Sequence, residues 1–305
     1  MVAQKPIVSI VIPTRNRPAL VVRAVKTALT QSLTEIEVIV VIDGPDAATV
    51  KALSAIEDGR VFVISLPRSF GGSEARNIGI RKSRGEFIGL LDDDDEWSPN
   101  KLSRQLELAR KSTALFPVVT CRLIARRPIS DEIWPARQIE RRESMCDYLL
   151  CREASIRQGE GFIQSSTLLV PRALLLQVPF TSGLPRHQDW DWLIKASAHP
   201  GVAFLWVWDP LVIYHIDAAR NSISSDMSLG ASMDWVDSNR LISSRARAYF
   251  YATQIAVRCK TPATLWRVIC NTLRQPRALL IGMGLALVPR SLVYSLRRRG
   301  ILTHA

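Results

Sequence analysis

Acidic residues are missing from the last fifth of this 305-residue sequence, because residues 240–305 contain no Asp or Glu. The same segment contains twelve Arg or Lys residues, so the whole net charge of +12 lies there. A protein that binds nucleic acid through its folded body would carry its positive charge on that body. The observed distribution instead favours a neutral body with a basic, apolar segment that meets an anionic membrane surface, and we expect no nucleic-acid partner.

Cysteine pairs and long apolar runs are also lacking. The five cysteines form no CxxC pair, which favours reduced thiols in a cytosolic compartment, and no secretory signal pattern is visible, so we expect a cytoplasmic location. The apolar run at residues 278–288 is shorter than the roughly 20 residues that a bilayer-spanning helix needs. We expect basic, apolar helices that lie peripherally on the inner face of the membrane. A helical cap on the folded body and a single spanning helix are the alternatives.

Four short, β-branched apolar runs alternate with stretches of helical pattern in the first third of the sequence. The predicted strands are 7–12, 37–42, 61–64 and 87–91, and the predicted helices are 18–31, 46–57 and 72–84. Strands that are apolar on both faces and alternate with helices indicate an α/β fold with a mostly parallel sheet flanked by helices. Ligands of such sheets bind at the carboxyl ends of the strands.

The alternation changes after residue 91. The pattern predicts helices at 99–111 and 190–198, strands at 116–125, 166–170, 203–207 and 211–214, and a polar, irregular loop or lid at 126–160. From about residue 233 onward the pattern is helical. We therefore expect a catalytic domain over residues 1–230 and a helical, membrane-associated extension over residues 231–305.

Four consecutive aspartates, Asp92 to Asp95, directly follow the fourth predicted strand. Like charges packed together raise each other's pKa, so the run becomes favourable when a divalent cation neutralises part of the charge. Mn²⁺ and Mg²⁺ prefer carboxylate oxygens and leave positions open for substrate phosphates. On an extended chain, Asp92 and Asp94 would point the same way. A solvated acidic turn is the alternative.

Polar residues follow the other predicted strands as well. Pro13, Thr14 and Arg15 come after the first strand and are candidates for substrate binding. Asp43 comes after the second strand, where a carboxylate can accept hydrogen bonds from a nucleobase or ribose or can simply form a turn.

Two glycines, Gly71 and Gly72, precede the third predicted helix, and Arg76 lies one turn inside it. A helix N-terminus favours phosphate, and Arg76 can add a charge-assisted contact to a diphosphate. The segment has neither the Gly-Lys-Ser/Thr ending of a Walker loop nor a GxGxxG fingerprint, which argues against ATPases and dehydrogenases.

Taken in order, these segments resemble family 2 glycosyltransferases, an inverting group with the GT-A fold. The segments are VSIVIPTRNR, VIVVIDGPD, GGSEARNIGI and FIGLLDDDDEWSPNKL, which span residues 7–102. The resemblance implies that Asp43 contacts the base or ribose of a nucleoside-diphosphate sugar. It also implies a DxD motif at Asp92-Asp93-Asp94, with Asp94 as the principal Mn²⁺ or Mg²⁺ ligand and Asp92 nearer the ribose.

A later segment, HQDWDWL, resembles the acidic motif that supplies the general base of the family, with Gln188 in place of the usual Glu. The resemblance implies that Asp189 is the base and that Asp191 is the following substrate-binding position; a helix cap is the alternative for either residue. His215 resembles a late histidine that approaches the metal or diphosphate in the family, and a structural role is equally open.

The resemblance implies a glycosyltransferase that moves a sugar from a nucleoside-diphosphate sugar to a hydroxyl of a glycan or lipid-linked acceptor. A carboxylate base, a metal-bound diphosphate and Arg76 are a sufficient set for this chemistry. One alternative is a catalytically silent nucleotide-sugar-binding scaffold at the membrane. A sugar nucleotidyltransferase is the other, although it would carry a glycine-rich basic loop where this chain has PTRNRP.

Overall fold

The computed structural model of the chain describes residues 5–128, 130–151, 159–216, 229–258 and 261–287. It divides into two compact units. The first comprises Met1–Trp134 and Ile163–Arg220, and the second comprises Pro135–Phe162 and Asn221–Ala305. Residues 135–162 thus group with the C-terminal segment, while the expected boundary between residues 230 and 231 stays a prediction.

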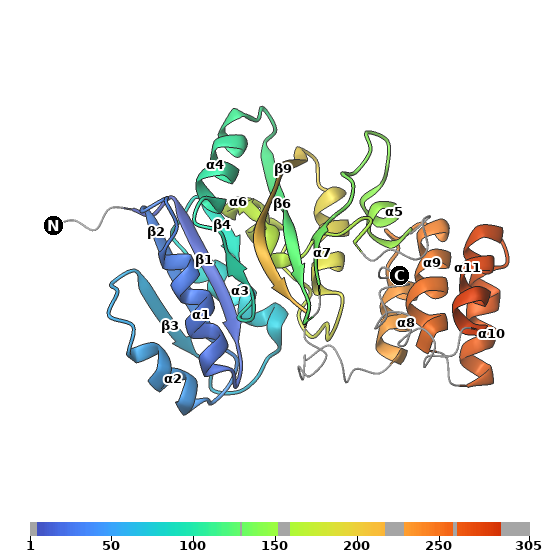
Figure 1. Ribbon diagram of the computed structural model, residues 1–305, viewed down its shortest axis with the longest axis horizontal. Coiled ribbons are helices and arrows are strands. Elements are labelled where there is room, and N and C mark those ends of the chain that lie inside the picture. The colour runs from blue at the N-terminus through green and yellow to red at the C-terminus, as the bar shows by residue number, and fades with distance from the viewer. Residues whose placement is uncertain (1–4, 129, 152–158, 217–228, 259–260, 288–305) are drawn as a thin grey trace. The chain divides into compact units, whose positions relative to one another are not determined.

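Four parallel strands form one half of the sheet of the first unit, in the order β3-β2-β1-β4 (Figure 1). These strands and their connecting helices are β1 (Val8–Thr14), α1 (Pro18–Leu29), β2 (Ile36–Ile42), α2 (Ala47–Ser54), β3 (Val61–Ser65), α3 (Gly72–Lys82) and β4 (Phe87–Leu90). Right-handed crossovers place α1 and α2 on one face and α3, which returns past β1 to β4, on the other. Both faces of β1 and β2 are therefore covered, and their Val and Ile side chains are buried. The four predicted strands and three predicted helices are confirmed.

The helix starts in this half follow from local chemistry. α1 begins with Pro18, whose fixed φ suits the first helical position. α2 begins after Asp46, whose side chain accepts a hydrogen bond from the backbone N of Thr49 (3.0 Å). α3 begins after Gly71, whose φ of 89° lies in the left-handed region that favours glycine. At each of these helix starts the chain turns back, so the residues that follow β1, β2 and β3 lie at the carboxyl edge of the sheet.

The other half of the sheet is mixed. Its elements are β5 (Glu96–Trp97), α4 (Lys101–Lys111), β6 (Phe116–Arg126), β7 (Asp131–Trp134), the 3₁₀ turn η1 (Ser165–Thr167), β8 (Leu169–Pro171), α6 (Arg172–Gln177), α7 (Gln188–Ser197) and β9 (Val202–His215). β8 lies antiparallel between β4 and β6, and β9 runs parallel to β6. The two strands predicted at 203–207 and 211–214 are one strand, because Pro210 is accommodated at a bulge opposite Arg122.

The described part of the second unit is helical. It contains α5 (Met145–Leu150), α8 (Leu229–Ser238), α9 (Ser244–Phe250), the π-helical turn Tyr251–Ile255, the 3₁₀ turn Ala256–Arg258, α10 (Pro262–Thr272) and α11 (Pro276–Leu287). Helix α5 packs against α9. The expectation of an irregular loop at 126–160 is wrong at residues 131–134, where β7 extends the sheet beside β6, and at 145–150, where α5 is a helix with a buried face. Residues 135–144 between them are irregular.

The helices of the extension are short. Within the described segments, no helix is both long and apolar enough to cross a bilayer. Residues 288–305, which include the basic run at 297–299, lie outside the described part of the chain.

Candidate functional site

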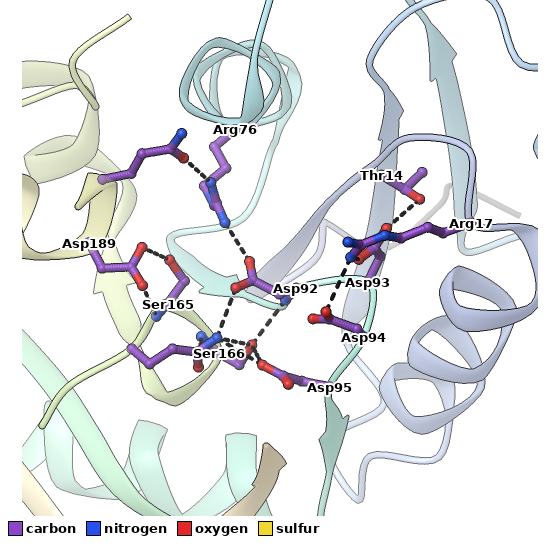
Figure 2. Close-up of polar contacts among 12 residues, drawn as sticks. Thr14, Arg17, Arg76, Asp92, Asp93, Asp94, Asp95, Ser165, Ser166 and Asp189 are labelled. Carbon is purple, nitrogen blue, oxygen red and sulfur yellow. Dashed lines mark hydrogen bonds and ion pairs between the residues drawn. The ribbon is translucent and has the colours of Figure 1, made fainter. Parts of the chain in front are cut away.

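The four aspartates after β4 form a turn rather than an extended run. The backbone N of Asp95 donates to the carbonyl oxygen of Asp92 (3.1 Å), which closes the turn. The expectation that Asp92 and Asp94 point the same way on extended chain is therefore wrong. Figure 2 shows the consequence, since Arg76 pairs with Asp92 on one side of the run and Arg17 pairs with Asp93 and Asp94 on the other.

Asp92 joins α3 to the turn η1. Its Oδ1 accepts from Arg76 Nη2 (2.5 Å), and its Oδ2 accepts from Gln164 Nε2 (2.8 Å). Arg76 is only 7% exposed and also donates from Nη1 to Gln188 Oε1 (2.8 Å). A buried guanidinium that bridges two segments in this way fixes the distance between Asp92 and the start of α7.

Asp93 and Asp94 both pair with Arg17. Arg17 Nη1 lies 3.0 Å from Asp93 Oδ1 and 3.1 Å from Asp94 Oδ2, and Thr14 Oγ1 donates to Asp93 Oδ2 (2.7 Å). Burial, together with the neighbouring charge of Asp94, raises the pKa of Asp93 to about 6. Thr14, expected to bind substrate, therefore positions the acidic run in this structure.

Asp95 is fully buried. Its Oδ2 accepts from Ser166 Oγ (2.6 Å) and Gln164 Nε2 (2.8 Å), whereas its Oδ1 is buried without a hydrogen-bond partner among the described residues. Burial and the charges of Asp94 and Asp92 raise the pKa of Asp95 well above its ordinary value. A buried carboxyl oxygen without a partner costs free energy unless a bound group or ion supplies the missing contact.

Asp189 lies in the first turn of α7 and faces η1. Its Oδ1 accepts from Ser165 Oγ (2.5 Å) and its Oδ2 from the backbone N of Ser165 (3.2 Å). Burial and the charge of Asp92 raise the pKa of Asp189, while Arg76 and Ser165 oppose the rise. His187, just before the helix, has a φ of 61°, an unusual backbone for a residue other than glycine that is often found at functional sites.

The acidic run and Asp189 place several carboxyl groups close together, and a bound cation would relieve the repulsion between those that are ionised. No cluster of three or more His, Cys, Asp or Glu side chains suited to a metal occurs in the described ranges. Mg²⁺ commonly binds through one or two carboxylates and completes its shell with substrate phosphates and water. Because Arg17 Nη1 contacts an oxygen of each, Asp93 and Asp94 face a common point, and their carboxylate oxygens are donors that suit a divalent ion.

Asp43 holds the loop that precedes α3. Its carboxylate accepts from Ser69 Oγ (2.6 Å), Phe70 N (2.7 Å) and Gly71 N (3.0 Å), and Arg15 Nη1 donates to Ser69 Oγ (3.1 Å). A carboxylate can accept about four hydrogen bonds, so Asp43 retains capacity for a ligand. Its contact with a nucleobase or ribose stays a prediction.

Three other candidates have different partners. Asp191 accepts from Thr181 Oγ1 (2.6 Å) and lies 3.2 Å from Lys195 Nζ, and His215 Nε2 lies 2.6 Å from Glu96 Oε1. Pro13 lies within β1, opposite Val41. The structure thus brings together Thr14, Arg76, Asp92, Asp93, Asp94 and Asp189 and gives Asp191, His215 and Pro13 other neighbours. The roles of all these residues stay predictions.

Sequence reasoning missed the side chains that connect these carboxylates. Gln164, Ser165 and Ser166 are consecutive and hold Asp92, Asp95 and Asp189. A Gln-Ser-Ser segment carries no recognisable signal, since its role depends on which distant strand lies beside it. Arg17 could have been found, because it ends the PTRNR segment that follows β1.

The chain matches known families over most of the first unit. The model of the family described as Glycosyl transferase family 2 matches residues 9–169. The chain is 28% identical over 252 residues to the amylovoran biosynthesis glycosyltransferase AmsB of Erwinia amylovora, covering 80% of this chain and 81% of that protein.

Solved structures share the fold at low sequence identity. The structure of S. aureus TarS 1-349 in complex with UDP-GlcNAc matches with a TM-score of 0.64 and 15% identity, covering 96% of this chain and 92% of that one. The mannosyltransferase PcManGT from Pyrobaculum calidifontis, in complex with GDP-Man and Mn²⁺, matches with a TM-score of 0.53 and 16% identity, covering 98% and 80%. These likenesses confirm the GT-A-type α/β fold. The chain belongs to glycosyl transferase family 2, the family that its motifs resemble.

Proposed function

We propose that this glycosyltransferase moves a sugar, with inversion, from a nucleoside-diphosphate sugar to a hydroxyl of a surface glycan or lipid-linked acceptor. The observation that carries the proposal is the network Asp189–Ser165 and Arg76–Asp92, which holds the half-buried Asp189 carboxylate beside the acidic run. Polysaccharide biosynthesis as the setting is supported by the relative named for amylovoran biosynthesis.

The donor would lie along the carboxyl ends of β1, β2 and β4. Asp43 would accept from the base or ribose, and Arg15, which contacts the same loop through Ser69, lies beside it. Asp94 would be the principal ligand of Mn²⁺ or Mg²⁺, with Asp92 nearer the ribose. When bound, that ion would supply positive charge to the diphosphate leaving group. Family 2 enzymes with this fold commonly use a divalent metal.

Asp189 would accept the proton of the acceptor hydroxyl. The acceptor oxygen forms a bond to the anomeric carbon on the face opposite the diphosphate, the carbon–diphosphate bond breaks, and the proton ends on Asp189. Burial makes the carboxylate a stronger base than one in water, and the two hydrogen bonds from Ser165 fix its orientation. Arg76 keeps the Asp92 carboxylate in one position during the reaction.

Replacing Ser165 by Ala tests this arrangement through the pH profile. Four groups face Asp189: Arg76, Asp92, Ser165 and, from β9, Tyr214. Because the hydroxyl of Ser165 stabilises the ionised base, its loss should raise the pKa of Asp189 further. The acid limb of kcat/KM should then move to higher pH, with activity on that limb falling roughly tenfold.

The matched control is Thr120→Val, which also removes one buried hydroxyl hydrogen bond, to Thr167 (2.9 Å), without touching Asp189. It should leave the acid limb unchanged even if it lowers stability. If the acid limb of Ser165→Ala lies at the same pH as that of the wild type, Ser165 does not influence the pKa of the proposed base.

The proposed location is the cytoplasm, at the inner face of the cell membrane. The basic, acid-free segment 240–305 and the biosynthetic role of the relative support it. A body whose charges balance over residues 1–239 argues against a nucleic-acid partner.

A panel of nucleotide sugars tests the proposal directly. One donor should release its nucleoside diphosphate in the presence of acceptor and Mn²⁺ or Mg²⁺, and EDTA should stop the release. Asp94→Asn should lower this rate by about two orders of magnitude or more, whereas Asp209→Asn, which alters an exposed ion pair with Arg104, should not.

The two alternative functions predict different results in this assay. A silent binding protein would bind a nucleotide sugar without releasing diphosphate, and a nucleotidyltransferase would release pyrophosphate from a nucleoside triphosphate and a sugar phosphate. Either result, together with no turnover on the panel, would refute the proposal.

A further inference from the structure

Helix α10 of the second unit is amphipathic, but its apolar side faces outward. Leu265, Trp266, Ile269, Cys270 and Leu273 fall within about 140° of the helix circumference, a sector without a charged residue. Leu265 is 44% exposed, Trp266 66% and Leu273 57%, and Cys270 is exposed as well. We call these five residues the α10 apolar face. A cluster of this kind is unusual on a surface that meets only water.

The polar side of α10 faces the second unit instead. Arg267 Nη2 lies 2.5 Å from Asp237 Oδ2, and the same carboxylate oxygen accepts from Tyr251 Oη (2.8 Å). Val268 and Thr272 are buried. Helix α10 therefore packs through Val268 and Thr272, with the Arg267–Asp237 pair on the same side, and this packing leaves the apolar face outward.

Positive charge borders the apolar face. Arg274 follows it at the end of α10, Arg277 lies in the first turn of α11, and both are exposed. Leu280 of α11 is also 71% exposed. Because no Asp or Glu occurs in residues 240–305, nothing in this segment offsets the positive charge. Exposed Trp and Leu beside arginines suit the headgroup region of an anionic bilayer, where aromatic rings and guanidinium groups concentrate.

We propose that the α10 apolar face binds an anionic phospholipid surface, with Trp266 and Leu273 entering the headgroup–acyl boundary and Arg274 and Arg277 contacting lipid phosphates. The proposal deepens the peripheral membrane association in the proposed function by assigning it to named side chains. It requires no particular donor, base or metal. A helix lying in the interface also agrees with the absence of a spanning helix among the described residues.

Flotation with vesicles tests the surface. The full chain should float with vesicles of phosphatidylglycerol and phosphatidylcholine, and much less with phosphatidylcholine alone. The double variant Trp266→Ser, Leu273→Ser should lower the partition coefficient at least about tenfold. Arg274→Gln with Arg277→Gln should lower it about fivefold or more, and only for the anionic vesicles.

Leu115→Ser is the matched control. Leu115 is 72% exposed in the first unit, outside the site and outside α10, so its loss should leave flotation unchanged. Equal losses in Leu115→Ser and in the α10 double variant, or wild-type flotation of the double variant, would overturn the proposal.

A probe on Cys270 reports insertion directly. Cys121, Cys146 and Cys151 are buried, so after Cys259→Ser, a position outside the described residues, a thiol-reactive fluorophore should label Cys270. Its emission should shift to the blue with anionic vesicles. If the emission does not shift, the proposal is wrong. If the wild type self-associates without lipid and the double variant does not, the face binds a protein partner instead, which also overturns the proposal. Diphosphate release without vesicles should be equal in wild type and double variant, which separates this test from that of catalysis.

Discussion

Asp189→Asn should lower turnover by roughly 10²- to 10⁴-fold while leaving donor binding close to that of the wild type. The amide keeps an oxygen that can accept from Ser165, so the geometry at the start of α7 should persist. What it loses is the capacity to take a proton from the acceptor. The measurement is diphosphate release at saturating donor and acceptor, with donor affinity from calorimetry.

Asp209→Asn controls for the change from carboxylate to amide, because Asp209 pairs with Arg104 at the surface. It should retain full turnover. Full activity in Asp189→Asn would mean that another group is the base. Loss of donor affinity equal to the loss of turnover would instead make Asp189 a donor-binding residue.

Arg76→Met should destabilise the folded chain by about 3 kcal/mol, because Asp92, whose side chain is only 22% exposed, then loses its cationic partner. Arg76 is almost completely buried and bridges Asp92 and Gln188, and its charge also opposes the rise in the pKa of Asp189. Urea unfolding at neutral pH measures the loss. Adding Asp92→Asn should recover part of it, since the unpaired charge is then gone.

Arg104→Met removes the same side chain from a surface ion pair in which both partners are about half exposed. Such pairs contribute at most about 1 kcal/mol, so its unfolding curve should nearly match that of the wild type. If Arg76→Met were equally mild, the pair with Asp92 would not hold the site together.

Much of the first unit could be predicted from sequence because its signals are local. The Val and Ile runs of β1 and β2 indicate strands buried on both faces, and Asp46, Pro18 and Gly71 mark helix starts through their own backbone preferences. The later half was harder. Two predicted strands proved to be β9, since only its pairing with β6 shows that Pro210 sits at a bulge.

In the helical extension, the sequence pattern does not determine which side of a helix is exposed. The spacing in α10 indicates an amphipathic helix in either environment, and a core-packed cap would bury Leu265 and Trp266. In the structure Val268 and Thr272 are the buried side chains, Arg267 pairs with Asp237 thirty positions away, and the apolar side is exposed.

The sequence alone determined the family, the order of strands and helices up to β4, and which carboxylates are candidates, because these depend on residue type and on neighbours along the chain. Only the tertiary structure decided how the carboxylates are held. It showed that Asp92 to Asp95 form a turn, that Asp93 and Asp94 share Arg17, and that Gln164, Ser165 and Ser166 connect Asp92 and Asp95 to Asp189. The physical reason is that hydrogen bonds and ion pairs act over about 3 Å in space, whatever the separation along the chain. Here the antiparallel entry of β8 beside β4 brings residue 165 next to residue 92.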